Sequence, residues 1–433
     1  MQADARLAQD FELTALPEGF AEDPFPVYRA LLEHAPMKRF SDGSVMLSRW
    51  ADLDRVYRDT TTFSSDKKVE FLPKFGRTPL YEHHTTSLVF NDPPLHTRVR
   101  KIMVGAMTPR ALAAMEPGLV KLVDGLLDRL AEKGEVDLIE DFAAAIPVEV
   151  IGNLFDIPHE ERGPLRDWSL AILGALEPVL NDEQQERGNR SVTDFKAFLK
   201  EIADERRRYP GDPATDVLTR LINGNEGEQL SEVELLQNCI FILNAGHETT
   251  TNLIGNALFE LTQWPDEKKR LQEDPELIAT AVDEFLRFQS PNQLGNRMAV
   301  APAEFHGEVI EPGTRIHLAI GAANRDPRQF ADPDRLDLSR KPNKHLAFAG
   351  GPHLCVGFSL AKMEGRIAIS RFLKRFPDYR ITGTPQRTGR VRFRGFSHLP
   401  AGWDRAGVTC QSGPPSPGLR FARPTSPHGG EEI

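Results

Sequence analysis

One helical segment constrains this fold more than any other feature of the chain. Ser231 begins the sequence Ser-Glu-Val-Glu234, which has the pattern of a capping box. In a capping box the side chains of the first and fourth residues, here Ser231 and Glu234, each accept a hydrogen bond from a backbone N–H group of the first turn. The helical pattern continues until Pro265 ends it, which gives a helix of about 33 residues, or roughly 50 Å. A helix of that length crosses a whole domain, so the rest of the chain must pack around it.

The segments on either side of this helix indicate the fold class. Most of residues 94–290 has helical periodicity with polar breaks, and the clearest further helices are Arg110 to Lys133, Pro147 to Leu154, Val192 to Arg208 and Ala214 to Ile222. Short alternating stretches predict strands at Glu308–Ile310 and Arg315–Ala319. We therefore predict a mainly α fold with small β-sheets, and no internal repeat. Residues near 66–90 and 170–190 mix aromatic and charged side chains, and we expect them to be loops that cover a pocket.

Composition narrows the class of protein further. The chain has 433 residues and a formal net charge of −10, which argues against general affinity for nucleic acid. Its three cysteines are far apart and odd in number, which is typical of a reducing cytoplasm rather than of a disulfide framework. No signal peptide and no apolar run of membrane-spanning length are present. We expect a cytoplasmic protein, monomeric and without a membrane anchor.

The C-terminal end differs in composition from the rest. From Ala401 onward, 14 of 33 residues are glycine, proline or serine, a share above the roughly 25–30% that marks low complexity. We expect one domain over residues 1–400 and a largely disordered tail over residues 401–433.

A glycine-rich loop near the C-terminus presents a single cysteine, Cys355, immediately before a helical pattern from Phe358 to Phe372. Backbone N–H groups of such a loop and the positive end of the next helix both favour a thiolate. Nearby glycines permit backbone angles and close approaches that a Cβ would forbid; they are Gly350, Gly351 and Gly357. A thiolate held in this way suits an axial ligand of haem iron. The alternative is an inert thiol; no second Cys/His pair has zinc spacing.

This loop resembles the haem-binding signature of the cytochrome P450 family, Phe-x-x-Gly-x-His-x-Cys-x-Gly. The matching residues are Phe348, Gly351, His353, Cys355 and Gly357. Ala349 is a mild departure, because glycine is commoner there. The resemblance implies the cytochrome P450 fold, with haem b between the long central helix and the helix after the cysteine loop. It also implies that Cys355 ligates the iron, that Phe348 packs beside it, and that His353 lies near a haem propionate.

The middle of the long helix contains a second motif, Ala245-Gly-His-Glu-Thr-Thr250. A glycine and three consecutive threonines are poor helix formers, and a hydroxyl that bonds back to a carbonyl one turn earlier bends a helix. By itself the motif could be a tolerated weak spot with its glutamate in water. It resembles the family's oxygen-binding motif, which implies that Thr249 hydrogen-bonds the bound oxygen and Glu248 relays protons. Ala245 and Gly246 would leave room for O2.

Two further motifs resemble parts of the family that hold the haem and the frame. Within Asn91–Arg100, His96 and Arg100 share one helix face and would bind propionates together with Arg297. Any one of these alone could instead be a solvated surface group. Glu284 and Arg287 match the family's Glu-x-x-Arg pair, a buried structural anchor that is joined by the segment 323–327. We expect loss of Arg287 to abolish haem incorporation.

The resemblance implies a monooxygenase that inserts one atom of O2 into a small organic substrate, by hydroxylation or dealkylation. The chain carries no flavin or iron–sulfur segment, so a separate ferredoxin and ferredoxin reductase are expected. Cations that could meet the ferredoxin, or could form a scattered solvated surface, are Arg98, Lys101, Lys344, Lys362 and Arg366. A peroxide-using or isomerising haem-thiolate enzyme and a non-catalytic haem sensor remain alternatives. The acid–alcohol pair favours the O2-dependent reaction, since relatives that use peroxide often lack it.

The expected substrate pocket has an unusual share of polar side chains. By position in the family pattern its residues are Leu88, Val89, Phe241, Asn244, Gln293, Leu294 and Phe396. Asn244 and Gln293 favour a substrate with a hydrogen-bonding group, such as a small aromatic or terpenoid. Both amides could equally be satisfied by water or by backbone groups.

Overall fold

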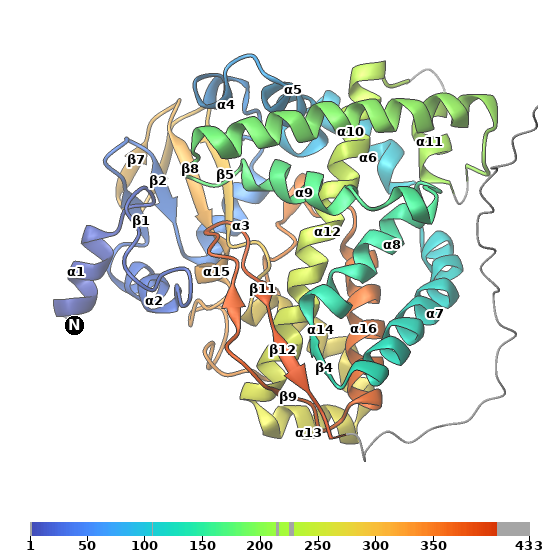
Figure 1. The fold of residues 1–433 in the computed structure, drawn as a ribbon. Helices are drawn as coiled ribbons and strands as arrows, with labels where there is room; N and C mark the ends of the chain where they lie inside the picture. The colour runs from blue at the N-terminus through green and yellow to red at the C-terminus, as the bar shows by residue number, and fades with distance from the viewer. Residues whose placement is uncertain (1, 106, 214–215, 225–228, 405–433) are drawn as a thin grey trace, which may run out of the picture.

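The computed structural model describes residues 2–105, 107–213, 216–224 and 229–404. Helices surround a long central helix, α12; strands β1, β2, β5, β7 and β8 lie on the side of the N-terminus, and β4, β9, β11 and β12 lie away from it (Figure 1). The helices N-terminal to α12 are α1 (Gln2–Asp10), α2 (Phe25–His34), α3 (Trp50–Arg58), α4 (Lys68–Phe75), α5 (Pro79–Thr86), α6 (Leu95–Val104), α7 (Pro109–Lys133), α8 (Ala145–Leu154), α9 (Leu165–Gly174), α10 (Asp182–Arg208) and α11 (Val217–Asn223). From α12 onward they are α12 (Glu232–Gln263), α13 (Pro265–Glu273), α14 (Ile278–Phe288), α15 (Ile320–Ala323) and α16 (Phe358–Arg375).

The largest sheet is mixed and has the strand order β1-β2-β8-β5-β3, in which only β2 and β8 are parallel neighbours. Its strands are β1 (Met37–Arg39), β2 (Val45–Leu47), β3 (Phe63–Ser64), β5 (Leu294–Ala299) and β8 (Arg315–Ala319). The smaller sheets consist of β4 (Glu135–Asp137), β6 (Ala303–Phe305), β7 (Glu308–Ile310), β9 (Arg380–Ile381), β10 (Gln386–Arg387), β11 (Phe396–His398) and β12 (Pro400–Gly402).

The long helix forms as predicted. Ser231 is its N-cap, the reciprocal hydrogen bonds with Glu234 are both present, and the helix has 32 residues. It is buried on almost every side along its length because α5, α8, α9, α10, α14 and α16 all pack against it. The predicted strands at Glu308–Ile310 and Arg315–Ala319 have these same bounds as β7 and β8. The mainly α prediction is confirmed.

Two sequence expectations about loops are wrong. Residues 66–90 contain α4 and α5 rather than one loop. Most of residues 170–190 is also helical, and only a short connection between α9 and α10 is not. That connection ends at Asn181, whose side chain forms a capping box with Gln184 and starts α10 ten residues before the predicted Val192. Of the expected helix Ala214 to Ile222, the first two residues lie outside the described part of the chain.

The folded domain extends past residue 400. Ala401 and Gly402 lie in β12, where they pair with β4 and β9. Trp403 is buried and its ring stacks on Phe376 with 3.8 Å between centroids. The expected boundary was wrong by these residues, because a low-complexity count weighs composition and cannot detect a strand that other segments complete. Residues from 405 onward, including Cys410, lie outside the described residues.

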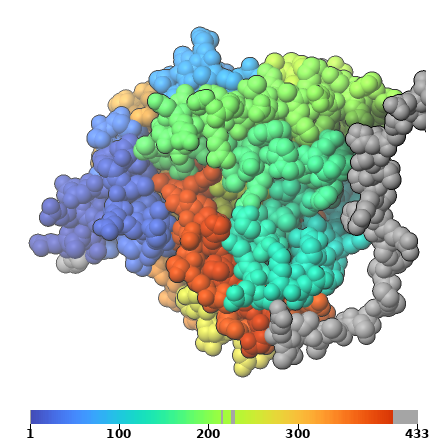
Figure 2. Space-filling view, viewed as in Figure 1, coloured from blue at the N-terminus to red at the C-terminus, as the bar shows by residue number. Residues whose placement is uncertain are grey.

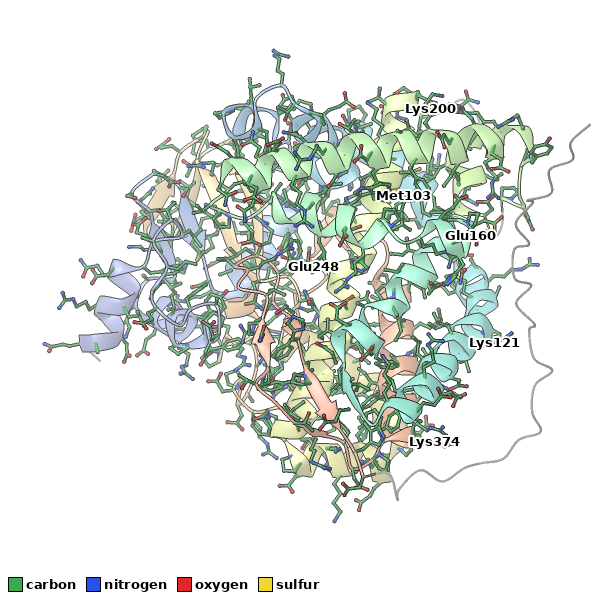
Figure 3. The ribbon with its side chains drawn as sticks, viewed as in Figure 1. Met103, Lys121, Glu160, Lys200, Glu248 and Lys374 are labelled. Atoms are coloured by element: carbon green, nitrogen blue, oxygen red, sulfur yellow. The ribbon has the colours of Figure 1, made fainter. Side chains whose placement is uncertain are left out.

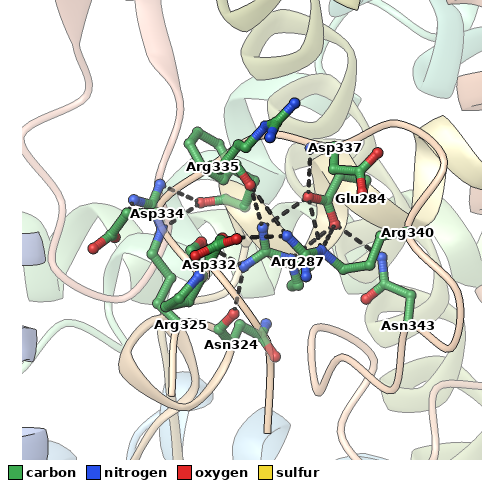
Figure 4. A network of polar contacts seen from close by, with 12 residues as sticks. Glu284, Arg287, Asn324, Arg325, Asp332, Asp334, Arg335, Asp337, Arg340 and Asn343 are labelled. Atoms are coloured by element: carbon green, nitrogen blue, oxygen red, sulfur yellow. Dashed lines mark hydrogen bonds and ion pairs between the residues drawn. The ribbon is translucent and has the colours of Figure 1, made fainter. Parts of the chain in front are cut away.

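The Glu284–Arg287 pair is fully buried and joins α14 to the long segment that precedes the cysteine loop (Figure 4). Arg287 Nη2 lies 2.7 Å from Glu284 Oε1, and Arg287 Nε lies 2.8 Å from Oε2. The guanidinium also donates to the backbone carbonyl of Asn324 at 2.9 Å, which confirms the expected link to residues 323–327. Arg340 and Asn343 donate to the same carboxylate.

No described helix is long and apolar enough to span a membrane.

Candidate active site

Cys355 lies at the start of α16, in a loop that is closed by its own backbone. Its N–H donates to Phe348 O at 3.0 Å, which folds the loop back on itself. Gly357, the N-cap of α16, donates its N–H to the Cys355 sulfur. The loop therefore directs a backbone donor and a helix N-terminus at the thiol, as the sequence predicts.

The glycines of this loop have unequal roles. Gly351 has φ +61°, and a Cβ there would lie 2.1 Å from Tyr57 O, so only glycine fits. Gly350 and Gly357 have no such requirement, because their φ angles are −160° and −86° and a Cβ would contact nothing closer than 3.5 Å. Ala349 has φ +58°, a left-handed conformation that explains why glycine is commoner at this position.

The charge environment of Cys355 is mixed. Burial among protein atoms raises the pKa of the thiol, while the Gly357 N–H group and the nearby Arg100 guanidinium lower it. The side chain is nevertheless accessible to solvent. The Phe348 ring lies 6.2 Å from that of Phe358, the first residue of α16.

Cationic and imidazole groups from three separate segments meet near this loop. The rings of His96 on α6 and His353 are 3.9 Å apart, and His353 Nε2 lies 3.1 Å from Ser65 Oγ. Burial first, and then Arg100 and Arg297, lower the pKa of His96 to about 4 against the opposing effect of Asp92. Arg297 on β5 is also buried.

These groups form no ion pair within the described residues, and the carboxylate that acts on His96 and Arg297, Asp92, accepts hydrogen bonds from Ser64 and Ser65 instead. His96 Nε2 is buried without a hydrogen-bond partner, and neither Arg100 nor Arg297 forms an ion pair there. Burying cations without counter-charges is costly. Two arginines and two imidazoles beside an accessible thiol therefore fit a ligand that carries two carboxylates and a metal, as haem does.

Thr249 has the geometry that the motif predicts. Its Oγ1 donates to Ala245 O at 2.7 Å, one turn earlier on α12, and Thr251 Oγ1 donates to His247 O at 2.9 Å. Both hydroxyls therefore compete with the helix ladder in the middle of α12. Gly246 also has a packing role, because a Cβ there would lie 2.4 Å from Ile151 Cδ1 on α8, while its expected role of leaving room for O2 stays a prediction.

Glu248 is buried and does not face water. Both of its oxygens lie 2.6 Å from Nη1 of Arg390, a residue of the C-terminal segment (Figure 3). Burial raises the pKa of Glu248 to about 7, and Arg390 opposes that rise. The acid is therefore close to half-ionised at neutral pH.

Arg390 connects Glu248 to the surface. Its side chain is 19% exposed and lines a groove of about 470 Å³. The groove lies where an N-terminal segment, the α9–α10 region and the C-terminal segment meet (Figure 2). Further lining residues are Leu13, Leu16, Glu177, Arg187 and Thr388.

The expected substrate residues have different surroundings in the structure. Leu88, Val89 and Phe241 belong to one apolar cluster. The backbone N–H of Leu88 donates to Asn238 Oδ1 on α12 at 2.9 Å. Asn244, on α12 one turn before Glu248, is 1% exposed, and neither its Nδ2 nor its Oδ1 has a partner among the described groups. These four residues remain candidates.

The other three expected substrate residues are buried, and their role in binding substrate stays a prediction. Phe396 packs on Phe259, ten residues beyond Thr249 and so about 15 Å further along α12. Leu294 belongs to the apolar cluster of the N-terminal helices. Gln293 Oε1 lies 2.0 Å from where a Gly321 Cβ would be, and its Nε2 donates to Ser290 O. Gln293 Oε1 is buried and has no hydrogen-bond partner among the described groups.

Sequence reasoning missed two arginines that the structure makes important, Arg390 and Arg392. The sequence does contain a signal, a cluster of four arginines at 387, 390, 392 and 394. All four are at least partly buried. Such a run is unusual for a solvated surface.

Two of the cations expected to meet a ferredoxin are already paired. Arg98 forms an ion pair with Glu234, and Lys362 Nζ lies 2.5 Å from Asp283 Oδ1. Lys344 and Arg366 are exposed. Solvent-exposed pairs of this kind are weak, so a docking surface here remains open to test.

Comparison with known proteins agrees with this geometry. Residues 167–378 match the family model for Cytochrome P450. The chain is 35% identical over 355 residues to the biotin biosynthesis cytochrome P450 of Bacillus subtilis, which covers 79% of this chain and 88% of the relative. It is 34% identical to the vitamin D(3) 25-hydroxylase of Pseudonocardia autotrophica, with 88% of this chain and 94% of the relative covered.

Solved structures show the same likeness. CalO2 superposes with a TM-score of 0.86 at 28% identity and covers 92% of this chain and all of its own. P450BioI, solved with a fatty-acyl-loaded acyl carrier protein, gives a TM-score of 0.84 at 31% identity over 89% of this chain and all of that one. The chain therefore belongs to the cytochrome P450 family. It is a P450 monooxygenase of the bacterial type.

Proposed function

We propose that this protein is a haem-thiolate monooxygenase that hydroxylates or dealkylates a small organic substrate, with haem b as cofactor. Cys355 is the iron ligand, and His96, Arg100, Arg297 and His353 hold the propionates. The single observation that carries the proposal is the meeting of unpaired cations and an accessible, backbone-bonded thiol in one place. When bound, haem supplies the redox chemistry that reduces O2 and transfers one oxygen atom.

The residues of α12 handle protons. Glu248, with a pKa of about 7, has both a protonated and an ionised form available near neutrality. Consecutive helix residues point about 100° apart, so Glu248 must leave Arg390 and turn, or act through a water, to reach Thr249 Oγ1. Arg390 holds the carboxylate at the inner end of a solvent-lined groove, where it can be reprotonated.

Electrons come from a separate ferredoxin and reductase in this proposal, and O2 is the oxidant. The acid–alcohol pair supports O2-dependent turnover over a peroxide-using or isomerising reaction and over a haem sensor. Consumption of NADH with a ferredoxin system, coupled to an oxygenated product, distinguishes these. Electron transfer with no dependence on salt would count against a charged docking surface.

The Thr249→Ala variant tests the assignment of the hydroxyl. We expect it to bind haem and a spin-state-shifting substrate normally but to divert most electrons to hydrogen peroxide, because proton delivery is impaired. Thr251→Ala is the matched control, since it also removes a back-bonded hydroxyl from α12. Equal coupling of electrons to product in Thr249→Ala and the wild type would refute the role of Thr249.

A further inference from the structure

Two largely buried cations, Arg392 and Lys74, lie on either side of the connection between α9 and α10. Arg392 is only 9% exposed, and its guanidinium donates to two backbone carbonyls, Leu294 O at 2.8 Å and Leu176 O at 3.0 Å. Lys74, on α4, is half-buried and donates to Glu177 O at 2.8 Å. Neither cation forms an ion pair within the described part of the chain. Charge without a counter-charge is costly at this depth.

The neighbouring charges leave one positive charge in excess. The Glu177 carboxylate accepts hydrogen bonds from the backbone N–H groups of Val391 and Arg392, at 3.0 and 3.2 Å. The other nearby pair, Lys67 and Glu70, is internally balanced, with Nζ 2.7 Å from Oε2. Arg392 and Lys74 together therefore face one carboxylate.

His84 supplies an independent observation. It is 2% exposed, and its Nε2 is buried without a hydrogen-bond partner among the described residues. The His84 ring lies 5.5 Å from the ring of Phe75, and Lys74 Nζ lies 5.1 Å from that same ring. Burial first, and then His83, Lys74 and Arg392, hold the pKa of His84 well below its usual value, so the ring stays neutral. Buried polar atoms normally have a hydrogen-bond partner. His84 Nε2, unpartnered and beside two cations, is therefore a place where an oxygen atom of a ligand would fit.

The surroundings of His84 are apolar. Its ring packs against Phe71, Phe75 and Phe90, with centroids 5.5 to 5.8 Å away. Phe90 continues the short helix 88–90 that carries Leu88 and Val89, two of the retained pocket candidates. A charged end and an aromatic wall thus adjoin the same pocket.

We propose that Arg392, Lys74 and His84 bind the carboxylate of an amphipathic monocarboxylic acid, whose apolar body lies along these phenylalanines toward α12. This assignment of the substrate class rests on the monooxygenase function proposed above. The carboxylate supplies the missing counter-charge and accepts from the His84 ring. Arg392 and Lys74 also tie the α9–α10 connection to the C-terminal segment and to α4, which holds both cations in place for the carboxylate.

The test compares carboxylic acids with their primary amides as ligands of the haem-loaded enzyme. Dodecanoic, hexadecanoic and phenylbutanoic acids, each beside its amide, are titrated by spin-state shift and by calorimetry. We expect at least one acid to bind roughly ten- to a hundredfold tighter than its amide, as charge-assisted hydrogen bonds imply. Arg392→Gln and Lys74→Met should each remove that preference while the affinity for the amide stays within about twofold.

Lys68→Gln is the matched control, because it removes the same charge from an exposed position of α4 and should preserve the preference. If Arg392→Gln does not fold, Lys74→Met decides the outcome. Equal affinity for acids and amides in the wild type, or no binding by any acid, would overturn the proposal. Equal losses for acid and amide in the variants would show a structural role instead. A thiolate-type CO spectrum in the same preparations keeps this outcome separate from failure of the proposed monooxygenase function.

Discussion

At the scale of single residues, the active site of this protein depends on groups held in states that they would not adopt in water. Glu248 carries a pKa near 7 because burial outweighs the attraction of Arg390. His96 is neutral because burial and two arginines disfavour its charged form. Each of these pKa shifts depends on a particular neighbouring side chain. The direction in which the pKa moves when that neighbour is replaced can therefore be predicted.

Arg390→Gln should raise the pKa of Glu248 above its value of about 7, because the cation that favours the carboxylate is lost while burial remains. Glu248 would then stay protonated to higher pH, and the alkaline limb of the pH profile of product formation should move upward. The carbonyl stretch of the protonated acid, followed by infrared titration, measures the shift directly. Arg390→Lys should restore most of the wild-type profile.

Arg187→Gln is the control for that change, since Arg187 lines the same groove without contacting Glu248. A profile for Arg390→Gln that coincides with both the control and the wild type would contradict the account of this ion pair.

Ala349→Gly should stabilise the protein by about 1 kcal/mol, because Ala349 is held at φ +58°, where a Cβ is strained and glycine is not. The entropy that glycine gains in the unfolded chain reduces this benefit without cancelling it. The free energy of urea unfolding measures the change. A loss of stability in Ala349→Gly would contradict the prediction, because that is the result expected when a Cβ is removed at a position with ordinary φ.

At the scale of elements, the caps and the hydroxyls of α12 follow directly from its sequence, whereas its neighbours do not. The capping box at Ser231 and the back-bonding of Thr249 are both present. The capping box of Asn181 and Gln184 was an equally clear signal for the start of α10. The prediction followed the apolar periodicity instead and placed the start at Val192. Burial of Glu248 had no local signal, because its partner is 142 residues away.

Helix α16 carries a buried acid that should make stability depend on pH. Glu364 is 3% exposed, its Oε2 has no partner among the described groups, and burial raises its pKa to about 8. The folded state therefore holds a proton that the unfolded chain releases near pH 4.5. Stability attributable to this group should be intact below about pH 4.5 and should fall by about 1.4 kcal/mol per pH unit up to about pH 8.

Glu364→Gln should flatten that slope, since the amide cannot ionise. Urea unfolding of the variant and the wild type at pH 6, 7 and 8 tests this. Parallel slopes in the two proteins would show that Glu364 is not the group responsible.

At the scale of the whole molecule, the fold class, the central helix and the cysteine loop could be predicted because each has a local cause: periodicity, caps and a required glycine. The pairing register of β5 and the strand β12 could not, because they depend on segments far apart in the chain. The arginines at 390 and 392 belong to the same class, since only the assembled fold gives them partners or leaves them without one.

The central claim concerns Cys355, and the difference spectrum of the reduced protein with CO tests it most directly. We predict the strongly red-shifted Soret band of a thiolate-ligated haem, abolished in Cys355→Ser and retained in Cys239→Ser, whose thiol is buried in α12. A band at the position typical of a neutral thiol or an imidazole in the wild-type protein, or a thiolate band that survives Cys355→Ser, would contradict the account.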